Sequence, residues 1–230
     1  MSLFRVLLCL IFVLACPLKG LGDESDDGLV LYSKGKWRNT ELEFKTSIRG
    51  QTIRLDLAEI VHNQPVSYLL DVASQSVFQL LPTKKIAKGP FFTDSSSIQG
   101  DLKKKVPQLH RTGKTETIAG YLAEQYIRTY EDGRAFEVWL TQDIKLPSNI
   151  LRSITAFTRQ FAREDANALA EQGAFELRKV GRLADGSVWM INEVIKVERA
   201  TLKDEVFDIP PDFQRIEAQS AEAAEKNGSQ

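Results

Sequence analysis

Apolar and polar residues alternate along the first part of the chain. Every second residue is apolar or threonine in TELEFKTSI, at 40–48, and again in TIRLDL, at 52–57. Only Arg49, Gly50 and Gln51 separate the two stretches. A period of two is typical of an antiparallel strand with one buried face. The pattern therefore predicts two neighbouring strands of a sheet that buries one side.

Further strand-like runs follow this pair. VSYLLDV, at 66–72, and SVFQLL, at 76–81, are joined by a short polar turn. Near the end of the chain, SVWMINEVIKVERATL, at 187–202, is rich in β-branched and aromatic residues and is entered through the turn Asp185-Gly186. These runs predict an antiparallel sheet, and they show no repeat of fixed length.

The stretch GKTETIAGYLAEQYIRTYEDGRAFEVWLTQDI, at 113–144, is the most organised part of the chain. We expect a strand that starts at 115–118 and continues through 121–130. Gly120 inside such a strand predicts a bulge, a sharp bend or a close backbone approach. The polar residues 131–134 predict a turn, after which 135–141 returns.

The two sides of the returning strand differ. Phe136, Val138 and Leu140 share one face, and Trp139 lies on the other, beside Glu137. One side is therefore core, and the other carries at least one large aromatic ring. Two interpretations stay open: a curved sheet with a partly covered outer face, or a bent sheet with a lined cavity.

A helix is predicted from Pro147-Ser148 onward. Its apolar stripe recurs at spacings of four, three and four residues, with Leu151 alongside. The stripe consists of Ile150, Ile154, Phe157 and Phe161. REDANALAEQ, at 163–172, predicts a second and more polar helical piece that ends at Gly173. Such a stripe ordinarily packs into a core, and a ligand role is the alternative.

Three stretches resemble the signature of a bacterial family of exported domains of unknown function. They are KTETIAGYLAEQY, FEVWLTQDIKLP and VERATLKDEVFDIPPDFQRI, spread over about 113–216. That family is similar to the LolA/LolB lipoprotein-carrier superfamily. Many relatives carry a cysteine shortly after the Gly-Tyr pair, where this chain has Leu122-Ala123-Glu124, so we expect no thiol-dependent role.

The resemblance implies an α+β fold: a curved antiparallel sheet, or half-barrel, with helices covering its concave face. In the Lol carriers that cavity holds acyl chains. The resemblance thus implies a possible lipid or lipoprotein acyl chain as partner, in a cavity lined from the helix and the returning strand. The candidate residues are Ile150, Ile154, Phe157, Phe161, Phe136, Val138 and Trp139.

The start of the chain has the pattern that is typical of an export signal. Arg5 precedes an apolar run from Val6 to Ala15, which is shorter than the roughly 20 apolar residues of a membrane-spanning helix. We expect a signal peptide at 1–22, cleaved after Gly22. The alternative is a lipoprotein signal that ends before Cys16, with Cys16 lipidated. Either exit predicts an exported, periplasmic protein, anchored as a lipoprotein in the second case.

The composition of the chain argues against several classes of function. The only cysteines, Cys9 and Cys16, lie in the signal region, so we expect no disulfide in a mature domain at 23–216, followed by a polar tail at 217–230. The chain has 30 basic and 31 acidic residues, a balance that argues against a nucleic-acid binder. No catalytic motif is present, and the two histidines, His62 and His110, lack partners at metal-ligand spacing. We therefore expect no enzyme, no metal and no cofactor.

Basic residues concentrate between 84 and 114, where Gly89-Pro90, the serine run 95–97 and Pro107 predict loops. The predicted basic patch consists of Lys84, Lys85, Lys88, Lys103, Lys104 and Lys105. It is either a solvated connection or a contact for an anionic membrane surface. Two functions remain: an envelope protein that binds an apolar ligand in a half-barrel, or a structural protein with a filled core and an envelope protein partner.

Overall fold

The computed structural model describes residues 27–37, 40–61, 64–92, 108–157 and 173–217. Twelve strands form one sheet in the order β12-β6-β5-β4-β3-β2-β1-β11-β10-β9-β8-β7. All neighbours are antiparallel except β12 and β6. The strands are β1 (Asp27–Trp37), β2 (Thr40–Arg49), β3 (Thr52–Val61), β4 (Gln64–Asp71), β5 (Ser76–Leu81), β6 (Ile86–Phe92), β7 (His110–Ile118), β8 (Tyr121–Thr129), β9 (Ala135–Thr141), β10 (Phe175–Arg182), β11 (Val188–Thr201) and β12 (Gln214–Ile216).

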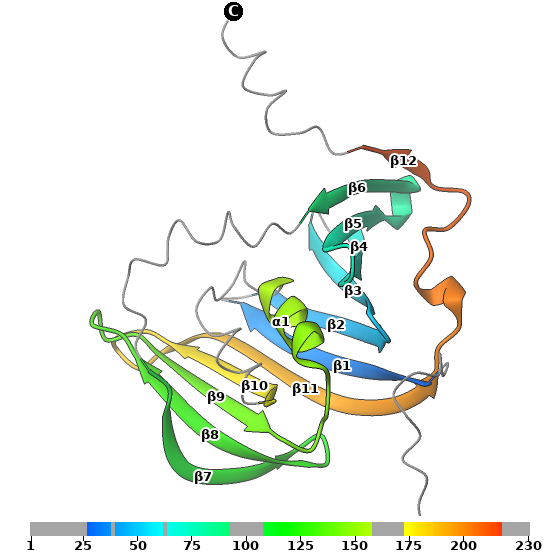
Figure 1. The fold of residues 1–230 in the computed structure, drawn as a ribbon. Helices are drawn as coiled ribbons and strands as arrows, with labels where there is room; N and C mark the ends of the chain where they lie inside the picture. Colours follow the sequence, from blue (N-terminus) through cyan, green and yellow to red (C-terminus); the bar gives the residue numbers. More distant parts are fainter. Residues whose placement is uncertain (1–26, 38–39, 62–63, 93–107, 158–172, 218–230) are drawn as a thin grey trace, which may run out of the picture.

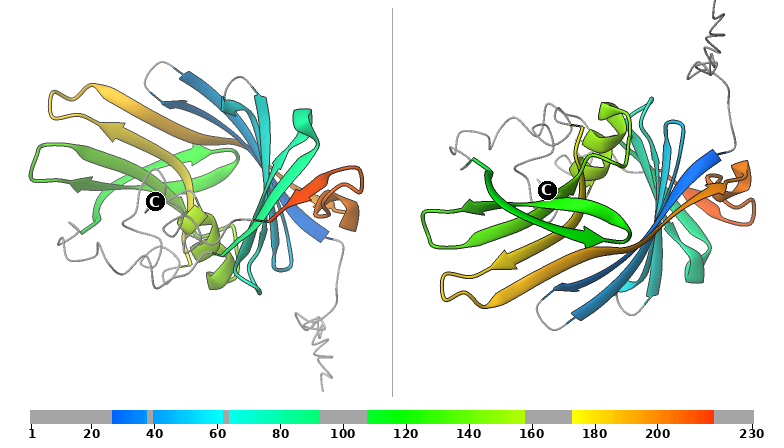
Figure 2. Two further views of the ribbon diagram at one scale, coloured as in Figure 1. Left: turned by 90° about the horizontal axis from the view of Figure 1, so that it is seen from above. Right: turned by 90° about the horizontal axis from the view of Figure 1, so that it is seen from below.

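The sheet curls round without closing (Figures 1 and 2). Its two ends, β7 and β12, each pair with one neighbour among the described strands. The predicted curved antiparallel sheet is therefore confirmed. The alternations at 40–48 and 52–57 correspond to β2 and β3, and the runs at 66–72, 76–81 and 187–202 correspond to β4, β5 and β11.

One α-helix lies within the described residues, on the concave side of the sheet (Figure 1). This helix, α1 (Ser148–Phe157), starts where Pro147 accepts a 3.0 Å hydrogen bond from the backbone N–H of Leu151. The second predicted helical piece, 163–172, lies outside the described residues. The described part of the chain thus shows one helix on this face, and the prediction of a second helical piece stays a prediction.

The region around Gly120 differs from the prediction. Ile118 pairs directly with Tyr121, so Ala119 and Gly120 form a two-residue turn and β8 runs back along β7. Both residues have positive φ, 50° for Ala119 and 86° for Gly120, as the two central residues of a type I′ hairpin turn require. The predicted continuous, bent strand is wrong, because the chain reverses here.

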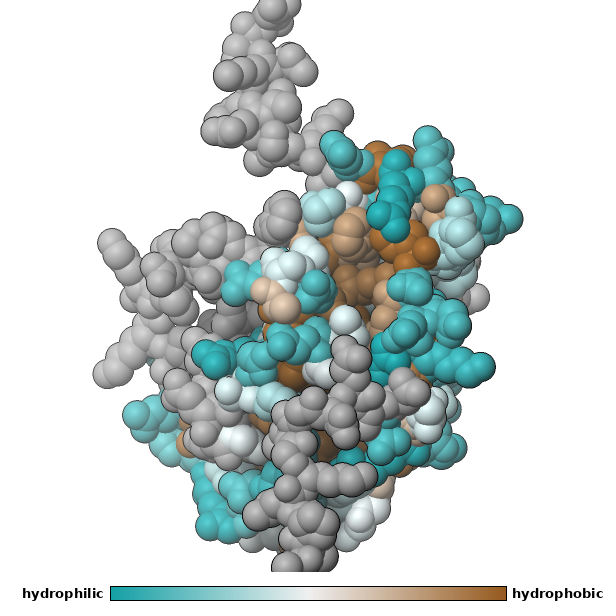
Figure 3. Space-filling model, turned by 45° about the vertical axis from the view of Figure 1, so that its right-hand side comes forward, coloured by the Kyte–Doolittle hydropathy of each residue, from teal (hydrophilic) through white to brown (hydrophobic). Residues whose placement is uncertain are grey.

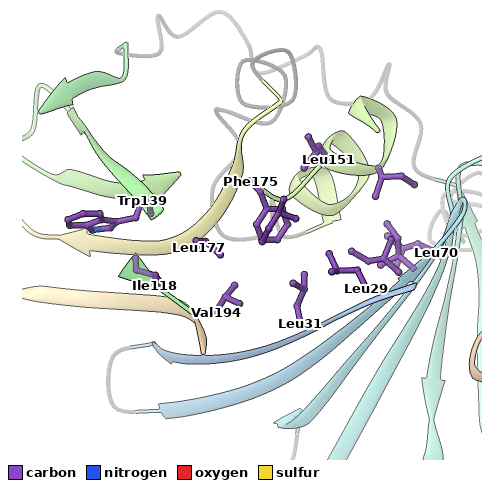
Figure 4. Packing of buried hydrophobic residues seen from close by; sticks show 14 of the residues in the cluster. Leu29, Leu31, Leu70, Ile118, Trp139, Leu151, Phe175, Leu177 and Val194 are labelled. Carbon is purple, nitrogen blue, oxygen red and sulfur yellow. The ribbon is translucent and has the colours of Figure 1, made fainter. Parts of the chain in front are cut away.

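The main core lies on the concave face. It joins side chains from ten strands to α1, and Figure 4 shows them pointing into the space between the sheet and the helix. Its strand members include Leu29, Leu31, Ile48, Ile53, Leu70, Val77, Ile118, Trp139, Phe175, Leu177 and Val194. Ile150 and Leu151 of α1 are only 1% and 3% exposed. The amphipathic stripe of the helix is therefore a core element.

The convex face is covered at one end by the C-terminal segment, residues 202–216 (Figure 1). Ile209 and Phe213 pack against Leu69, Leu80 and Ala87 of the sheet. On the face seen in Figure 3, apolar side chains gather below β12 within a hydrophilic rim.

Candidate functional site

The concave face is the candidate site, and its floor is an apolar surface on β2 and β3. Leu42 and Phe44 lie on the same side of β2 as the buried Ile48, and Leu55 and Leu57 lie on the same side of β3 as the buried Ile53. The alternation predicted from the sequence is thus confirmed. These four side chains are half-buried rather than buried.

The neighbouring strand extends this surface. Register pairs place Val66 beside Leu57 and Tyr68 beside Leu55. Tyr68 packs against the main core, and its hydroxyl accepts a 3.1 Å hydrogen bond from Gln79 Nε2. The floor therefore combines mostly aliphatic and aromatic side chains with the hydroxyl groups of Thr46 and Tyr68, which is a surface that favours apolar ligands over charged ones.

The far end of the concave face is charged. Arg178 lies over the ring of Trp139, with its Cζ 5.6 Å from the ring centroid. Its guanidinium donates to Glu116 at 2.8 Å and to Glu193 at 2.5 Å. The hydrogen bond from Arg178 holds the pKa of Glu116 below its ordinary value, and the bond to Glu116 raises the pKa of Arg178. Both shifts favour the charged forms of Glu116 and Arg178, so neither group is suited to proton transfer at neutral pH.

A second ion pair lies beside the first. Arg182 Nε contacts Glu137 at 2.5 Å, and Glu137 also accepts a 3.2 Å bond from Gln125. These contacts link β8, β9 and β10 at this end. The opposite charges of Arg182 and Glu137 neutralise each other. We therefore interpret this cluster as one that stabilises the sheet and not as a reaction centre.

The structure separates the predicted cavity residues into two groups. Trp139, Ile150 and Ile154 belong to the concave core or pack against it. Val138 and Phe136 instead lie on the convex face, in a cluster with Leu140, Ala174, Leu109 and Tyr126. Nothing is described for the side chain of Phe157, and Phe161 lies outside the described residues. The predicted set therefore does not line one surface.

The convex cluster includes Phe136, the aromatic residue that the sequence placed opposite Trp139. Phe136 makes edge-to-face contacts with Tyr130 and Trp189, at centroid distances of 5.9 and 5.8 Å. Lys179 Nζ lies 5.1 Å from the centroid of the Phe136 ring. The convex face of the sheet is thus apolar at this point.

The predicted basic patch is only partly described. Lys84, Lys85 and Lys88 are exposed, and Lys85 pairs with Asp212 at 2.9 Å. Lys88 lies on β6 and not in a loop. Lys103, Lys104 and Lys105, like Cys16, lie outside the described residues.

His110 is exposed on β7. Among the described residues, no group of three or more histidine, cysteine or carboxylate side chains is arranged to hold a metal ion, and no helix is long and apolar enough to cross a bilayer.

Two hollows lie on the sheet, with volumes of about 380 and 280 Å³. The smaller one opens between the sheet and the C-terminal segment, where Leu69 and Phe78 face Phe207 and Ile209. The larger one is on the convex side of β1 to β4 and includes Tyr32 and Ile195. None of the five predicted cavity residues whose side chains are described lines either hollow, and the sequence alone pointed to neither.

Comparisons with known proteins agree with this architecture. A family model described as "Domain of unknown function (DUF4412)" matches residues 41–213. None of the curated proteins matches the chain. Among solved structures, an uncharacterized conserved protein from Thermus thermophilus is similar, with a TM-score of 0.50, 12% identity, and coverage of 83% of this chain and 90% of that one. This likeness shows the fold alone.

More distant likenesses include the Pseudomonas aeruginosa MucA/MucB complex, with a TM-score of 0.45, 11% identity, and coverage of 84% of this chain and 59% of that one. Another is a domain from Vibrio parahaemolyticus, provisionally described as an outer membrane lipoprotein-sorting protein domain. Its TM-score is 0.35, its identity 10%, and the coverage 81% of this chain and 91% of that one. A lipoprotein-sorting domain is thus among the matches, as the resemblance to the LolA/LolB carriers led us to expect. At these TM-scores, neither structure carries an argument about function.

Proposed function

Because the chain belongs to the family described as Domain of unknown function (DUF4412), whose description names no activity, we propose a function from the structure itself. The protein is a non-catalytic cell-envelope protein. It binds an apolar ligand, such as the acyl chain of a lipid or lipoprotein, on the concave face of its open sheet. The expected export signal at 1–22 supports the envelope location.

One observation carries this proposal: the concave apolar surface extends beyond the part that is buried. Ile48 and Ile53 are 4% and 3% exposed. Leu42, Phe44 and Leu57, on the same face, stay half-buried. Apolar surface removed from water stabilises a complex by about 25 cal/mol per Å². An acyl chain laid along this floor would gain that stabilisation without requiring a charged partner.

The test is to place a charge on this floor. Phe44→Glu is expected to weaken binding of a dansyl-labelled undecanoic acid at least about tenfold, because the carboxylate must stay hydrated where the chain would lie. Gln51→Glu adds the same charge in the exposed β2–β3 turn and should leave binding unchanged. Leu57→Gln serves as a milder second variant. Unchanged probe affinity in a folded Phe44→Glu protein would refute the proposal.

A different observation favours a second candidate, an interaction protein of the envelope with a filled core. Every residue of β7 except Ile118 is exposed, and the described strands cover only one edge of β7. A partner peptide could add a strand there. Crosslinking in cells should then capture a protein partner that Thr117→Pro loses, because proline removes a backbone donor. Capture of the same partner by that variant would exclude the edge.

A further inference from the structure

Two β-bulges flank β1 and β2. In β11, Ile195 is the extra residue, since Tyr32 pairs with Lys196 and Ser33 pairs with Val194. Further along the sheet, residues 58–60 of β3 stand against Pro65 of β4 alone. A bulge bends its strand and increases the local twist. The larger hollow lies between these two bulges, on the convex face.

The lining of this hollow is largely apolar. Its volume of about 380 Å³ falls within the range of small-molecule sites, roughly 300–1,000 Å³. The bulge turns Ile195 outward, where 46% of the side chain is exposed. The apolar side chains that line it on the convex face are those of Tyr32, Ala58, Pro65 and Ile195. A ligand that binds in the hollow would therefore remove this apolar protein surface from contact with water.

Most charges of the hollow are already paired. Lys34 Nζ lies 3.1 Å from Glu43 Oε1. Asp56 Oδ1 accepts hydrogen bonds from Ser67 Oγ at 2.6 Å and from Arg54 Nε at 2.8 Å. Among the charged residues that line the hollow, Lys45 is the one without an ion pair closer than 4 Å in the described part of the chain. Its charge acts on Glu198 and helps to lower the pKa of that carboxyl group, after the hydrogen bond from Lys196.

A second cation lies beside Lys45. Tyr32 stands in register between Lys45 on β2 and Lys196 on β11. Lys196 Nζ is 5.4 Å from the centroid of the Tyr32 ring and pairs with Glu198. Counted together, Lys34, Lys45, Lys196 and Arg54 exceed Glu43, Asp56 and Glu198 by one charge. The charged residues that line the hollow balance, and the single excess positive charge comes from including its neighbours Arg54, Lys196 and Glu198.

We propose that this hollow is a binding site for a small anion with a compact apolar body, such as an aryl or short branched-chain carboxylate. The acid group of the ligand pairs with Lys45, and the apolar body contacts Tyr32 and Ile195. The site lies on the opposite face of the sheet from the core residues Ile48 and Ile53, so it is independent of acyl-chain binding on the concave face.

The probe for this site is 4-phenylbutyrate, titrated calorimetrically into the mature chain. We expect saturable binding that weakens about tenfold in Lys45→Gln, because a charge-assisted hydrogen bond is lost. The uncharged analogue 4-phenylbutanol should bind the original chain and the variant equally. Lys36→Gln is the matched control, since Lys36 is exposed on β1 but does not line the hollow.

Methyl NMR of isoleucine locates the bound probe. The Ile195 methyl should shift on titration, while those of Ile48 and Ile150 in the concave core should not. Ile195→Ser, at an exposed position, should weaken binding without loss of fold. Absence of binding at millimolar probe, equal affinity in Lys45→Gln, or shifts at Ile48 and Ile150 in place of Ile195 would each overturn the proposal.

Discussion

On the concave face, β1 to β4 pack against the apolar stripe of α1, whereas on the convex face β3 to β6 pack against residues 202–216. We call α1 the concave cover and residues 202–216 the convex cover. Different kinds of contact hold these two covers on the sheet. The helix contributes side chains such as Ile150. The C-terminal segment is also held by two arginines: Arg49 donates to the carbonyl of Leu202 at 2.5 Å, and Arg54 donates to that of Val206 at 2.9 Å.

The difference shows how one sheet can stabilise a fold and still keep apolar surface for binding. The arginine contacts fix the convex cover by directed hydrogen bonds to its backbone. The concave cover packs on the sheet through apolar side chains, and Phe44 and Leu57 stay half-buried beyond it. We therefore expect the strongest stability effects at the helix and the strongest binding effects on the floor of β2 and β3.

The largest expected effect is at the centre of the concave cover. Ile150→Ala should lower the free energy of unfolding by about 2–5 kcal/mol, because it removes a large side chain that is 1% exposed. Arg152→Ala, on the exposed side of the same helix, should change it by less than about 0.5 kcal/mol. Urea denaturation measures both. Similar losses in the two variants would show that α1 is not a core element.

The convex cover should become less stable when the contacts of Arg49 are removed. Arg49 contacts Leu202 and Asp204, and its guanidinium lies 5.1 Å from the centroid of the Phe207 ring. Arg49→Ala should destabilise the protein by about 1–3 kcal/mol. It should also speed hydrogen exchange in the C-terminal segment before the rest of the sheet. Arg199→Ala, exposed on β11, is the control. Unchanged exchange in the segment would mean that apolar packing alone holds it.

A smaller effect is expected at the β7–β8 turn. Gly120→Ala places a side chain at a φ of 86° and should cost about 1 kcal/mol of stability. No atom lies within 4 Å of the position such a Cβ would occupy, so the cost is conformational. Ala119→Gly, at a φ of 50°, should be neutral or stabilising. Thermal unfolding measures the pair, and equal effects would contradict the turn geometry.

The smallest effect is a dependence on pH. Arg178 lowers the pKa of Glu116 in the folded protein. The stabilisation from this pair is therefore present above the ordinary pKa of glutamate and is lost as the pH falls through the lowered value. Glu116 is 43% exposed, so the effect is small. Glu116→Gln should flatten the acid limb of the stability profile slightly, and an unchanged profile would mean that the ion pair contributes nothing measurable.

The sequence predicted most of the sheet because one face of each strand is more apolar than the other. It failed at Ala119-Gly120 because the residues on both sides look like one strand, and alanine is not the residue expected at positive φ. It also gave no sign of β10. There, Leu177 is an extra residue in the ladder, so Phe175, Leu177 and Val180 lose the period of two.

The candidate site was predictable only in part. The helix stripe and the opposite faces of Trp139 and Val138 follow from local periodicity, and the structure agrees with both. The convex hollow depends on the bulges at Ile195 and at residues 58–60, which place residues from five strands together. Local patterns do not encode such a long-range register, so the sequence did not reveal it.

The most direct measurement of the central claim is native mass spectrometry of residues 23–230, exported to a bacterial periplasm and purified without detergent. The account predicts a co-purifying acyl-chain mass that is released on mild activation and is absent from Phe44→Glu. A clean mass of the protein alone, together with no uptake of added phospholipid or lipopeptide, would contradict it. The concave face would then be a core surface, and the exposed edge of β7 would become the candidate binding site.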